Sequence, residues 1–327
     1  MNPQQKSLDY YIKKFKSLRQ GGTKFGPAPH KAVLLLSVIR AIESGYINNN
    51  FISVSPVLVS LFKTTWNNLV ESQHVPTFAL PFFHLKSEGF WFLHVNPGFE
   101  NWLKVTKSLS SFNQLRIAVN HASLDGELFL LLNSPKSRNV LKQVLLETYF
   151  NNCRNTWDMV STGESYFDNV SQLIIREDPS EYVANIKRLE STLDKEEFTE
   201  EVFIRSGAFK REISRIYNNT CCISGLRIDA TTEVSMIDAC HIVPFAESHD
   251  DTISNGLALC PTLHRAFDRH LISIDDDYRV VIAKSFIERC DSPYSIKQFE
   301  GKHIQLPSTS NLYPSLSNLY KHRNLVL

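Results

Sequence analysis

The spacing of polar residues between positions 238 and 270 is the feature that most constrains how this chain can fold. His241 follows a strand-like run, Asn255 comes fourteen residues later in a Ser-Asn-Gly turn, and His264 comes nine residues after that. Asp268 lies about one helical turn beyond His264, so the two side chains share a face of the predicted helix. A strand, an ordered polar loop and a short helix in this order predict a ββα metal-binding module.

Patterns on both sides of this stretch supply the other elements of the module. We expect a helix running into a turn at 209–225, strands at 236–243, 271–274 and 279–283, and a helix at about 262–269. These elements predict a small α+β domain over residues 202–327.

The residue types at these positions suit phosphodiester hydrolysis. That reaction needs an activated water, which a histidine acting as general base supplies, and a cation that neutralises charge on the phosphate and the leaving oxygen. Isolated histidines are more often ordinary surface or core residues, and we expect this for His249 and His270. The three-residue spacing in a strand, loop and helix is more specific than any single histidine.

On these residues the chain resembles the HNH nuclease family. The matching segments are ACHIVPF, SNGLALC and LHRAFD, and the segments DRHLISID and NLYKHRNLVL resemble one branch of that family. The resemblance spans roughly residues 205–327. It implies that His241 is the general base, that Asn255 orients the histidine or the metal loop, and that His264 is a metal ligand or a phosphate contact.

The resemblance leaves the second metal ligand open. Many members carry Asp or His directly before the base, where this chain has Cys240. Asp238 is the preferred alternative because residues two apart in a strand share a face, and Asp268 comes next. Carboxylate and water ligands favour Mg²⁺ or Mn²⁺, whereas a His-rich site favours Ni²⁺, Co²⁺ or Zn²⁺.

The cysteines argue against a structural zinc. Many relatives flank the core with two Cys-x-x-Cys pairs that bind a structural zinc, but here Gly225 stands at the partner position of Cys222 and Leu263 at that of Cys260. An unusual site from Cys221, Cys222, Cys240 and Cys260 remains an alternative, and small buried thiols are the interpretation we favour. The six cysteines have no disulfide-framework spacing, which favours reduced thiols and a cytoplasmic location.

The first half of the chain predicts a second, mainly helical α+β domain. We expect helices at 5–19, from about His30 to Gly45, and at 55–70, strands at 51–54 and 90–95, and two or three helices within 111–150. Gly and Pro residues between 21 and 29 predict a loop before the second helix.

Charge divides the chain into three parts. Residues 1–160 carry a net charge of +8, residues 161–201 carry −7, and residues 202–327 balance. We therefore predict a first domain at 1–160, an acidic linker at 161–201 with a helix from about Ser180 to Leu193, and the nuclease-like domain at 202–327. A basic first domain favours DNA or RNA as its partner, because clustered cations release counterions from phosphates.

Motifs in the first domain resemble the sulfur-binding domain that precedes HNH domains in phosphorothioate-dependent, type IV restriction endonucleases. They are GPAPHKAVLLLSVIRAIESG, LPFFHLKSEGFWFL, LRIAVNHASLDGELFLLL and VLLETYF, covering about residues 20–150. Members of that family recognise DNA in which sulfur replaces a non-bridging phosphate oxygen. Sulfur is less strongly hydrated than oxygen, so a shallow apolar cup accepts it and penalises the oxygen.

The resemblance places the cup and its basic surroundings on six residues. Leu80, Pro81 and His84 would form the cup, and the DNA contacts beside it would be His30, Lys31 and Arg116. Relatives often have Arg in place of Lys31 and a smaller apolar residue in place of His84. Most of the nearby aromatic residues, among them Phe82 and Trp91, we expect in the hydrophobic core.

Together these features predict a modification-dependent DNA endonuclease that acts on phosphorothioated double-stranded DNA. One HNH site cuts one strand, so a double-strand break suggests a homodimer. Two alternatives stay open: a first domain that reads a modified base such as methylcytosine, with Trp66, Trp91 or Phe83 lining its pocket, and a DNA-binding regulator that does not cleave. We expect no membrane association, because no run approaches the ~20 apolar residues of a spanning helix.

Overall fold

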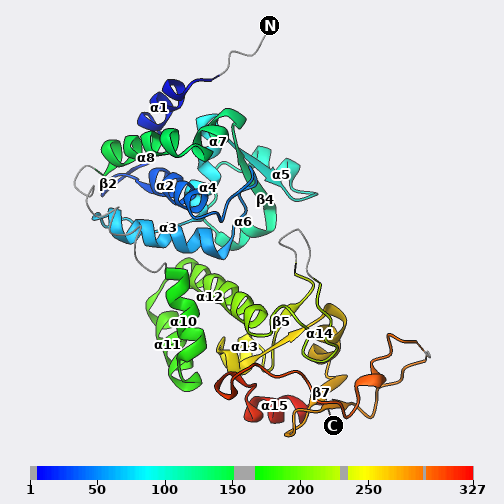
Figure 1. The fold of residues 1–327 in the computed structure, drawn as a ribbon. Helices are drawn as coiled ribbons and strands as arrows, with labels where there is room; N and C mark the ends of the chain where they lie inside the picture. The colour runs from blue at the N-terminus through cyan, green and yellow to red at the C-terminus, as the bar shows by residue number, and fades with distance from the viewer. Residues whose placement is uncertain (1–5, 151–165, 229–234, 290–291, 327) are drawn as a thin grey trace. The chain divides into compact units, whose positions relative to one another are not determined.

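The computed structural model describes residues 6–150, 166–228, 235–289 and 292–326, and the chain divides into two compact units (Figure 1). Unit 1 comprises Met1–Phe167 and Leu193–Ile204, and unit 2 comprises Asp168–Thr192 and Arg205–Leu327. Both combine helices with two-stranded antiparallel sheets, so the predicted α+β class is confirmed.

Helices dominate unit 1, and one of them forms its centre. They are α1 (Leu8–Lys16), α2 (His30–Glu43), α3 (Pro56–Leu69), α4 (Ala79–His84), α5 (Glu100–Val105), α6 (Phe112–Ala118), α7 (Gly126–Asn133) and α8 (Pro135–Tyr149), with a 3₁₀ turn η1 (Leu85–Glu88). Every residue of α2 from Lys31 to Ile42 is buried, because α3, α4, α7 and α8 pack around it. The predicted helices at 5–19, 30–45 and 55–70 are therefore confirmed, with shorter ends.

Local sequence explains where these helices begin and end. Ser55 caps α3 by accepting a hydrogen bond from the Leu58 backbone N–H at 3.2 Å, and Pro56 occupies the first turn. Gly45 follows α2 with a φ of +75°, the left-handed conformation that favours glycine at the end of a helix. The start of α3 and the end of α2 are thus encoded within a few residues.

The strands of unit 1 differ from the prediction at two places. β3 (Trp91–Val95) confirms the predicted strand, and it pairs with β4 (Val119–Leu124) in a segment for which only helices were expected. The predicted strand at 51–54 is reduced to one bridge, between Ile52 and Ala122. β4 directly follows α6, so its short buried-exposed alternation was hidden beside helix-forming residues. A short hairpin, β1 (Gly22–Thr23) and β2 (Gly26–Pro27), precedes α2.

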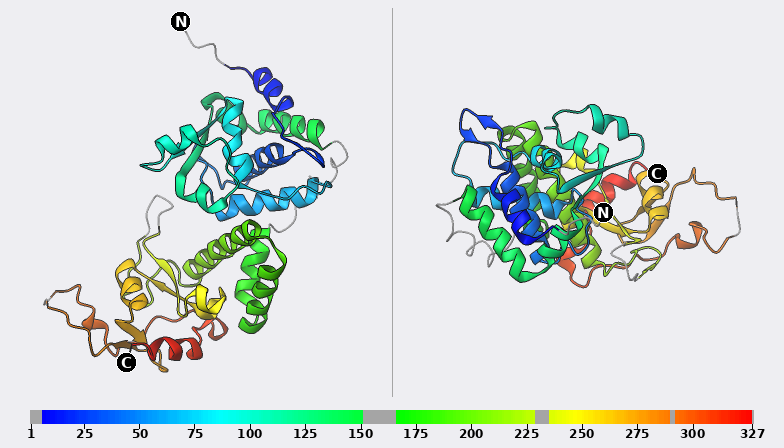
Figure 2. Two further views of the ribbon diagram at one scale, coloured as in Figure 1. Left: turned by 180° about the vertical axis from the view of Figure 1, so that it is seen from behind. Right: turned by 90° about the horizontal axis from the view of Figure 1, so that it is seen from above.

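The segment expected to be an acidic linker contains two helices and the first part of a third. They are α10 (Tyr166–Arg176), α11 (Pro179–Thr192) and α12 (Lys195–Ile216), and α11 confirms the predicted helix at 180–193. In unit 2, α10 and α11 pack beside the C-terminal half of α12 (Figure 2), where Arg211 donates to Asp168 at 3.1 Å and to Ser171 at 2.6 Å. The domain boundaries 1–160, 161–201 and 202–327 stay a prediction, and the first of them lies outside the described residues.

The rest of unit 2 contains a ββα arrangement. Its elements are β5 (Asp238–His241), α13 (Phe245–Ser248), η2 (Ile253–Asn255), β6 (Gly256–Leu259), α14 (Pro261–Asp268), β7 (Ile272–Ile274), β8 (Val280–Ile282), η3 (Lys297–Phe299), η4 (Ser310–Leu312) and α15 (Leu316–Arg323). β5 pairs with β6, which the sequence did not predict. All four residues of β6 are buried, so they lack the alternation that marks a strand with one exposed face. The partner of β5 was therefore missed, whereas β7, β8 and α14 were predicted.

Gly256 allows α12 to approach this sheet closely. A Cβ at this position would lie 2.9 Å from the Phe209 ring and closer still to the Ile213 side chain. Gly256 also pairs with His241 across the β5–β6 ladder. The missing side chain therefore lets α12 pack directly behind the end of β5.

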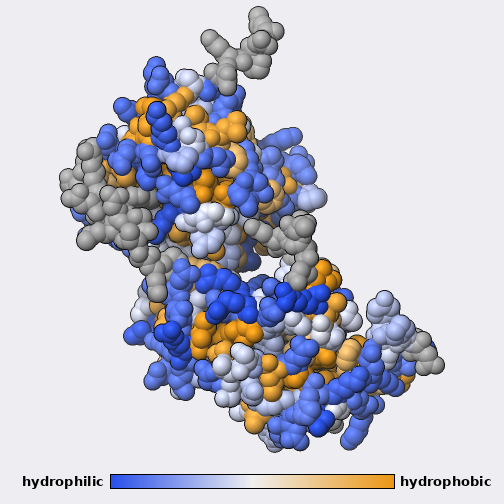
Figure 3. Space-filling model, in the orientation of Figure 1, coloured by the Kyte–Doolittle hydropathy of each residue, from blue (hydrophilic) through white to orange (hydrophobic). Residues whose placement is uncertain are grey.

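Most large apolar side chains lie in the cores of the two units. On the face drawn in Figure 3, the hydrophobic residues that remain visible are interspersed with hydrophilic ones. Among the described helices, none combines the length and hydrophobicity needed to cross a membrane.

Candidate active site

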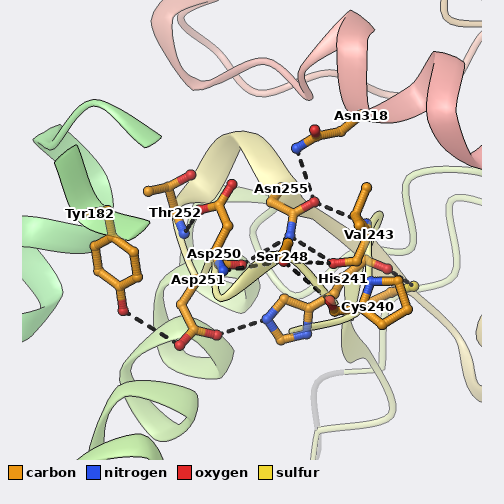
Figure 4. Close-up of polar contacts among 11 residues, drawn as sticks. Tyr182, Cys240, His241, Val243, Ser248, Asp250, Asp251, Thr252, Asn255 and Asn318 are labelled. Carbon is orange, nitrogen blue, oxygen red and sulfur yellow. Dashed lines mark hydrogen bonds and ion pairs between the residues drawn. The ribbon is translucent and has the colours of Figure 1, made fainter. Parts of the chain in front are cut away.

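His241 lies at the end of β5, where a buried carboxylate orients its ring. Its Nε2 is 2.8 Å from Asp251 Oδ1, and the Tyr182 hydroxyl donates to Asp251 Oδ2 at 3.4 Å (Figure 4). The imidazole also stacks on Phe209, with ring centroids 4.0 Å apart and planes 8° apart. Since an ionised carboxylate only accepts hydrogen bonds, Nε2 carries the proton and Nδ1 is the basic nitrogen. This tautomer suits a general base.

Asn255 braces the loop beside His241 and does not hydrogen-bond to the imidazole. Its Nδ2 donates to the carbonyl oxygens of Val243 and Asp250, both at 2.9 Å, and its Oδ1 accepts from the Val243 N–H at 3.0 Å. Asn318 of α15 donates to the same Oδ1 at 3.0 Å (Figure 4). The completely buried amide thus fixes the loop backbone, whereas Asp251 contacts the histidine.

His264, on α14, lies between two carboxylates. Its Nδ1 is 3.1 Å from Asp238 Oδ2, and its Nε2 is 3.4 Å from Asp268 Oδ2. Side-chain donor atoms of Cys240, His264 and Asp268 all lie within 4.8 Å of one another, close enough to hold a metal ion. A carboxylate on one ring nitrogen fixes the tautomer that leaves the other nitrogen available to a metal. This donor set fits a divalent cation, with Asp238 placed to orient His264.

Cys240 is the least suited of these three donors. Burial, reinforced by the charge of Asp268, raises the pKa of the Cys240 thiol well above its usual range, and the thiolate is the form that binds metals. His264 and Asp268 offer a cation an imidazole and a carboxylate without the deprotonation that Cys240 would require.

These residues border a cavity of about 430 Å³, here called the unit 2 cavity. His241, His264 and Asp268 form part of its lining, together with His270 and two residues of α15, Lys321 and His322. His270, which the sequence suggested was uninvolved, therefore borders the site, whereas His249 ends α13 in a left-handed conformation. Sequence reasoning missed Asp251 and Lys321. The Asp-Asp pair ahead of Ser-Asn-Gly was a usable signal for Asp251.

A second pocket, in unit 1, has a volume of about 440 Å³ and is here called the unit 1 pocket. It brings together five residues predicted from the sequence, namely His30, Lys31, Leu80, Pro81 and His84. The sixth, Arg116, does not line the pocket, since its guanidinium lies over the Phe203 ring at 4.3 Å. Arg19, which precedes the Gly-rich loop, is an exposed lining residue that the sequence analysis missed.

Little positive charge reaches the inner surface of the unit 1 pocket. Lys31, expected to be a DNA contact, is buried and forms an ion pair with the buried carboxylate of Glu88. His30 Nε2 lies 2.9 Å from the Val75 carbonyl oxygen, and burial lowers the pKa of His30 and of His84. Both rings are therefore neutral near pH 7.

The described cysteines are free thiols. Cys221, Cys222 and Cys240 are buried and Cys260 is half-buried. Cys153 and Cys290 lie outside the described residues.

The family comparison agrees with the geometry of unit 2. Residues 221–275 match the family described as HNH endonuclease. The chain therefore carries an HNH endonuclease domain. No curated protein matches the chain.

Solved structures give weaker likenesses. The modification dependent TagI restriction endonuclease is 23% identical over 36% of this chain and 37% of that one, with a TM-score of 0.26. The sulfur binding domain of SprMcrA complexed with phosphorothioated DNA is 17% identical over 47% of this chain and 94% of that one, with a TM-score of 0.35. The type IV phosphorothioation-dependent restriction endonuclease ScoMcrA is 11% identical over 78% of this chain and 94% of that one, with a TM-score of 0.30. The match spans little more than a third of the TagI chain, and at these TM-scores the likenesses support no inference about substrate.

Proposed function

We propose that this protein is a restriction endonuclease that binds phosphorothioated double-stranded DNA in the unit 1 pocket and hydrolyses DNA at its HNH site. The observation that carries the proposal is the clustering of His30, Lys31, Leu80, Pro81 and His84 around one pocket. Those five residues come from two motifs, and about fifty positions of sequence separate His30 from Leu80. The ligand is the one named for the SprMcrA and ScoMcrA structures, and it is proposed here from the motifs and the pocket.

The chemistry of the pocket supports sulfur as the recognised atom. Leu80 and Pro81 present apolar atoms, and the two histidines present neutral rings. A phosphate oxygen would have to give up strong hydration to enter such a surface, whereas sulfur is larger and less hydrated. Exposed Arg19 at the pocket suits a neighbouring phosphate, which would supply affinity without specificity.

In the hydrolytic step, His241 would act as the general base. Its Nδ1 would take a proton from the water that attacks the phosphorus, and Asp251 would stabilise the imidazolium that forms. A divalent cation held by His264 and Asp268 would neutralise charge on the phosphate and the leaving 3′ oxygen. Because one of these ligands is a carboxylate, we expect the cation to be Mg²⁺ or Mn²⁺. Asp238 would hold the His264 ring in place, and Asn255 would keep the loop around His241 fixed.

A panel of three matched duplexes tests this function. One carries a phosphorothioate, one carries methylated cytosine and one is unmodified, and each is incubated with the full chain and Mg²⁺ or Mn²⁺. We expect cleavage of the phosphorothioated duplex alone, abolished by a chelator. Equal cleavage of all three would remove the sulfur-reading proposal, and preference for the methylated duplex would replace it with base reading.

The oligomeric state is part of the same proposal. One HNH centre cuts one strand, so a double-strand break by a single bound species calls for a homodimer. Analytical ultracentrifugation on phosphorothioated DNA, read beside the ratio of nicked to linear plasmid, tests it. A monomer that linearises plasmid without a nicked intermediate would contradict the dimer.

A further inference from the structure

Glu88 forms an ion pair with Lys31, the one lysine among the described residues that line the unit 1 pocket. The Glu88 side chain is 4% exposed and that of Lys31 is 11% exposed. Lys31 Nζ also donates to Ser87 Oγ at 3.2 Å, and the Arg19 backbone N–H donates to Glu88 Oε1 at 3.2 Å. Both charges of the pair are thus buried and held by further hydrogen bonds.

This pair makes the inner surface of the pocket nearly neutral. Among the described residues that line the pocket, four are titratable, namely Arg19, His30, Lys31 and His84. The histidines are neutral near pH 7, and the charge of Lys31 is balanced by Glu88. Of these four residues, exposed Arg19 therefore keeps an uncompensated charge at the pocket. This neutrality is confined to the pocket, since residues 1–160 as a whole are basic and carry a net charge of +8.

A free lysine in this position would work against sulfur selection. An ammonium group is a compact, strongly hydrated point charge, and it makes its best hydrogen bonds to small, hard oxygen atoms. Directed into the pocket, it would attract any backbone phosphate and favour oxygen over sulfur. Neutralising Lys31 removes that attraction and leaves the apolar surface to discriminate.

We propose that Glu88 is a specificity-determining residue, which withholds the charge of Lys31 from the DNA so that the pocket accepts the sulfur of a phosphorothioate and rejects an ordinary phosphate. The inference rests on the proposed function, and it adds a residue outside the pocket lining. Glu88 acts through Lys31 and is therefore a positioning residue.

Two variants of the full chain test the role of Glu88. Glu88→Gln keeps an acceptor for the Arg19 N–H and frees the charge of Lys31, and the double variant Lys31→Gln with Glu88→Gln leaves an uncharged pair. Binding to phosphorothioated and unmodified duplexes is measured between 50 and 200 mM salt, conditions across which phosphate contacts change affinity strongly. Circular dichroism monitors folding.

We expect Glu88→Gln to bind unmodified DNA about tenfold more tightly, the gain of one charge-assisted hydrogen bond. Its salt dependence should steepen by about one released ion. In the double variant, which lacks the freed charge, the tighter binding of unmodified DNA and the steeper salt dependence of Glu88→Gln should both disappear. Should Glu88→Gln fail to fold, the double variant decides. A salt dependence of DNA binding equal to that of the wild type supports the inference. A salt dependence weaker by about one released ion overturns it, because Lys31 would then contact phosphate in the wild type.

The outcomes separate this inference from the proposed function. Wild-type protein that binds both duplexes equally removes the function and the inference together. Wild-type protein that discriminates, beside a folded Glu88→Gln variant with unchanged discrimination and salt slope, overturns the inference alone.

Discussion

The two cavities have nearly the same volume, about 440 Å³ in unit 1 and about 430 Å³ in unit 2, but opposite electrostatic designs. In the unit 1 pocket the lysine is neutralised by a buried glutamate and the histidines are neutral. In the unit 2 cavity, Asp268 and His264 lie together, with Asp238 on the other side of the imidazole, and the aspartates are about half exposed.

Under the proposed function, this difference lets one protein treat phosphate in two ways. A site that must distinguish sulfur from oxygen gains from suppressing its charge, because charge attracts every phosphate alike. A site that must break a phosphodiester bond gains from concentrating charge, because the transition state is more highly charged at its oxygens. Separate units allow each cavity to keep its own electrostatic environment.

The strongest separation of the two cavities should come from His241→Ala. Removing the proposed general base should lower the cleavage rate by about 10²- to 10⁴-fold and leave binding of phosphorothioated DNA unchanged within twofold. Single-turnover cleavage and equilibrium binding on the same duplex measure both quantities. Retained cleavage would overturn the general-base assignment, and lost binding would contradict the division of labour.

Asp251→Asn should have a smaller effect confined to the unit 2 cavity. The amide can still accept the Nε2–H of His241 but no longer stabilises a charged imidazolium, so kcat should fall by about tenfold or more with KM unchanged. Asp250→Asn is the matched control, because Asp250 accepts the Thr252 N–H instead of contacting His241. Equal losses in both variants would indicate a purely structural role for Asp251.

The two units should also respond to pH with opposite signs. Burial raises the pKa of Glu200 in unit 1 to about 7 from 4.5 and lowers the pKa of His322 in unit 2 to about 4 from 6.5. Burial outweighs the opposing charge of Lys63 at Glu200, and His270 is the ionisable neighbour that adds to the effect at His322.

The sign follows from which state binds the proton. Glu200 keeps its proton in the folded protein at pH values where the unfolded chain releases it. The free energy of unfolding of unit 1 should therefore fall by roughly 3 kcal/mol as pH rises from 4.5 to 7. Between pH 6.5 and 4 the unfolded chain protonates His322, whereas the buried ring of the folded protein stays neutral. The free energy of unfolding of unit 2 should therefore fall by a similar amount as pH falls from 6.5 to 4.

Spectroscopy can follow the two units separately. All four tryptophans precede residue 158, so tryptophan fluorescence reports unfolding of unit 1, and hydrogen exchange of α15 reports unit 2. Glu200→Gln should flatten the first pH dependence and His322→Gln the second. A common sign for both units would contradict the assignment of these two groups.

The smallest expected effects are a matched pair of helix-cap variants. Ser55 caps α3 in unit 1 and Ser315 caps α15 in unit 2, each by accepting a backbone N–H bond. Replacing either by Ala should cost about 1 kcal/mol, visible in fluorescence for Ser55→Ala and in hydrogen exchange of α15 for Ser315→Ala. If each variant shifted both signals equally, the units would unfold as one.

Much of the fold could be predicted because its signals are local. The caps and apolar periodicity of α2 and α3 lie within about twenty residues each, and the spacing of His241, Asn255 and His264 marks the HNH module within thirty. β4 and β6 were missed for different reasons. The first follows a helix without a break, and the second is buried on both faces and shows no alternation.

The candidate sites were predicted as residue types and completed by distant contacts. Lys31 was predicted as a contact to DNA, but its partner Glu88 is 57 residues away. Asn318, which bonds to Asn255, is 63 residues away from it, and Lys321 reaches the unit 2 cavity from the same helix. Such partners leave no periodic trace in the sequence.

The sequence by itself determined which chemical groups the chain offers, namely the histidines, carboxylates and apolar residues of two short motif regions, and the helices and strands that present them. The tertiary structure decided which of those groups remain charged and which of them line a cavity. The reason is that an element depends on neighbours along the chain, whereas the charge of a side chain depends on burial and on partners brought from elsewhere.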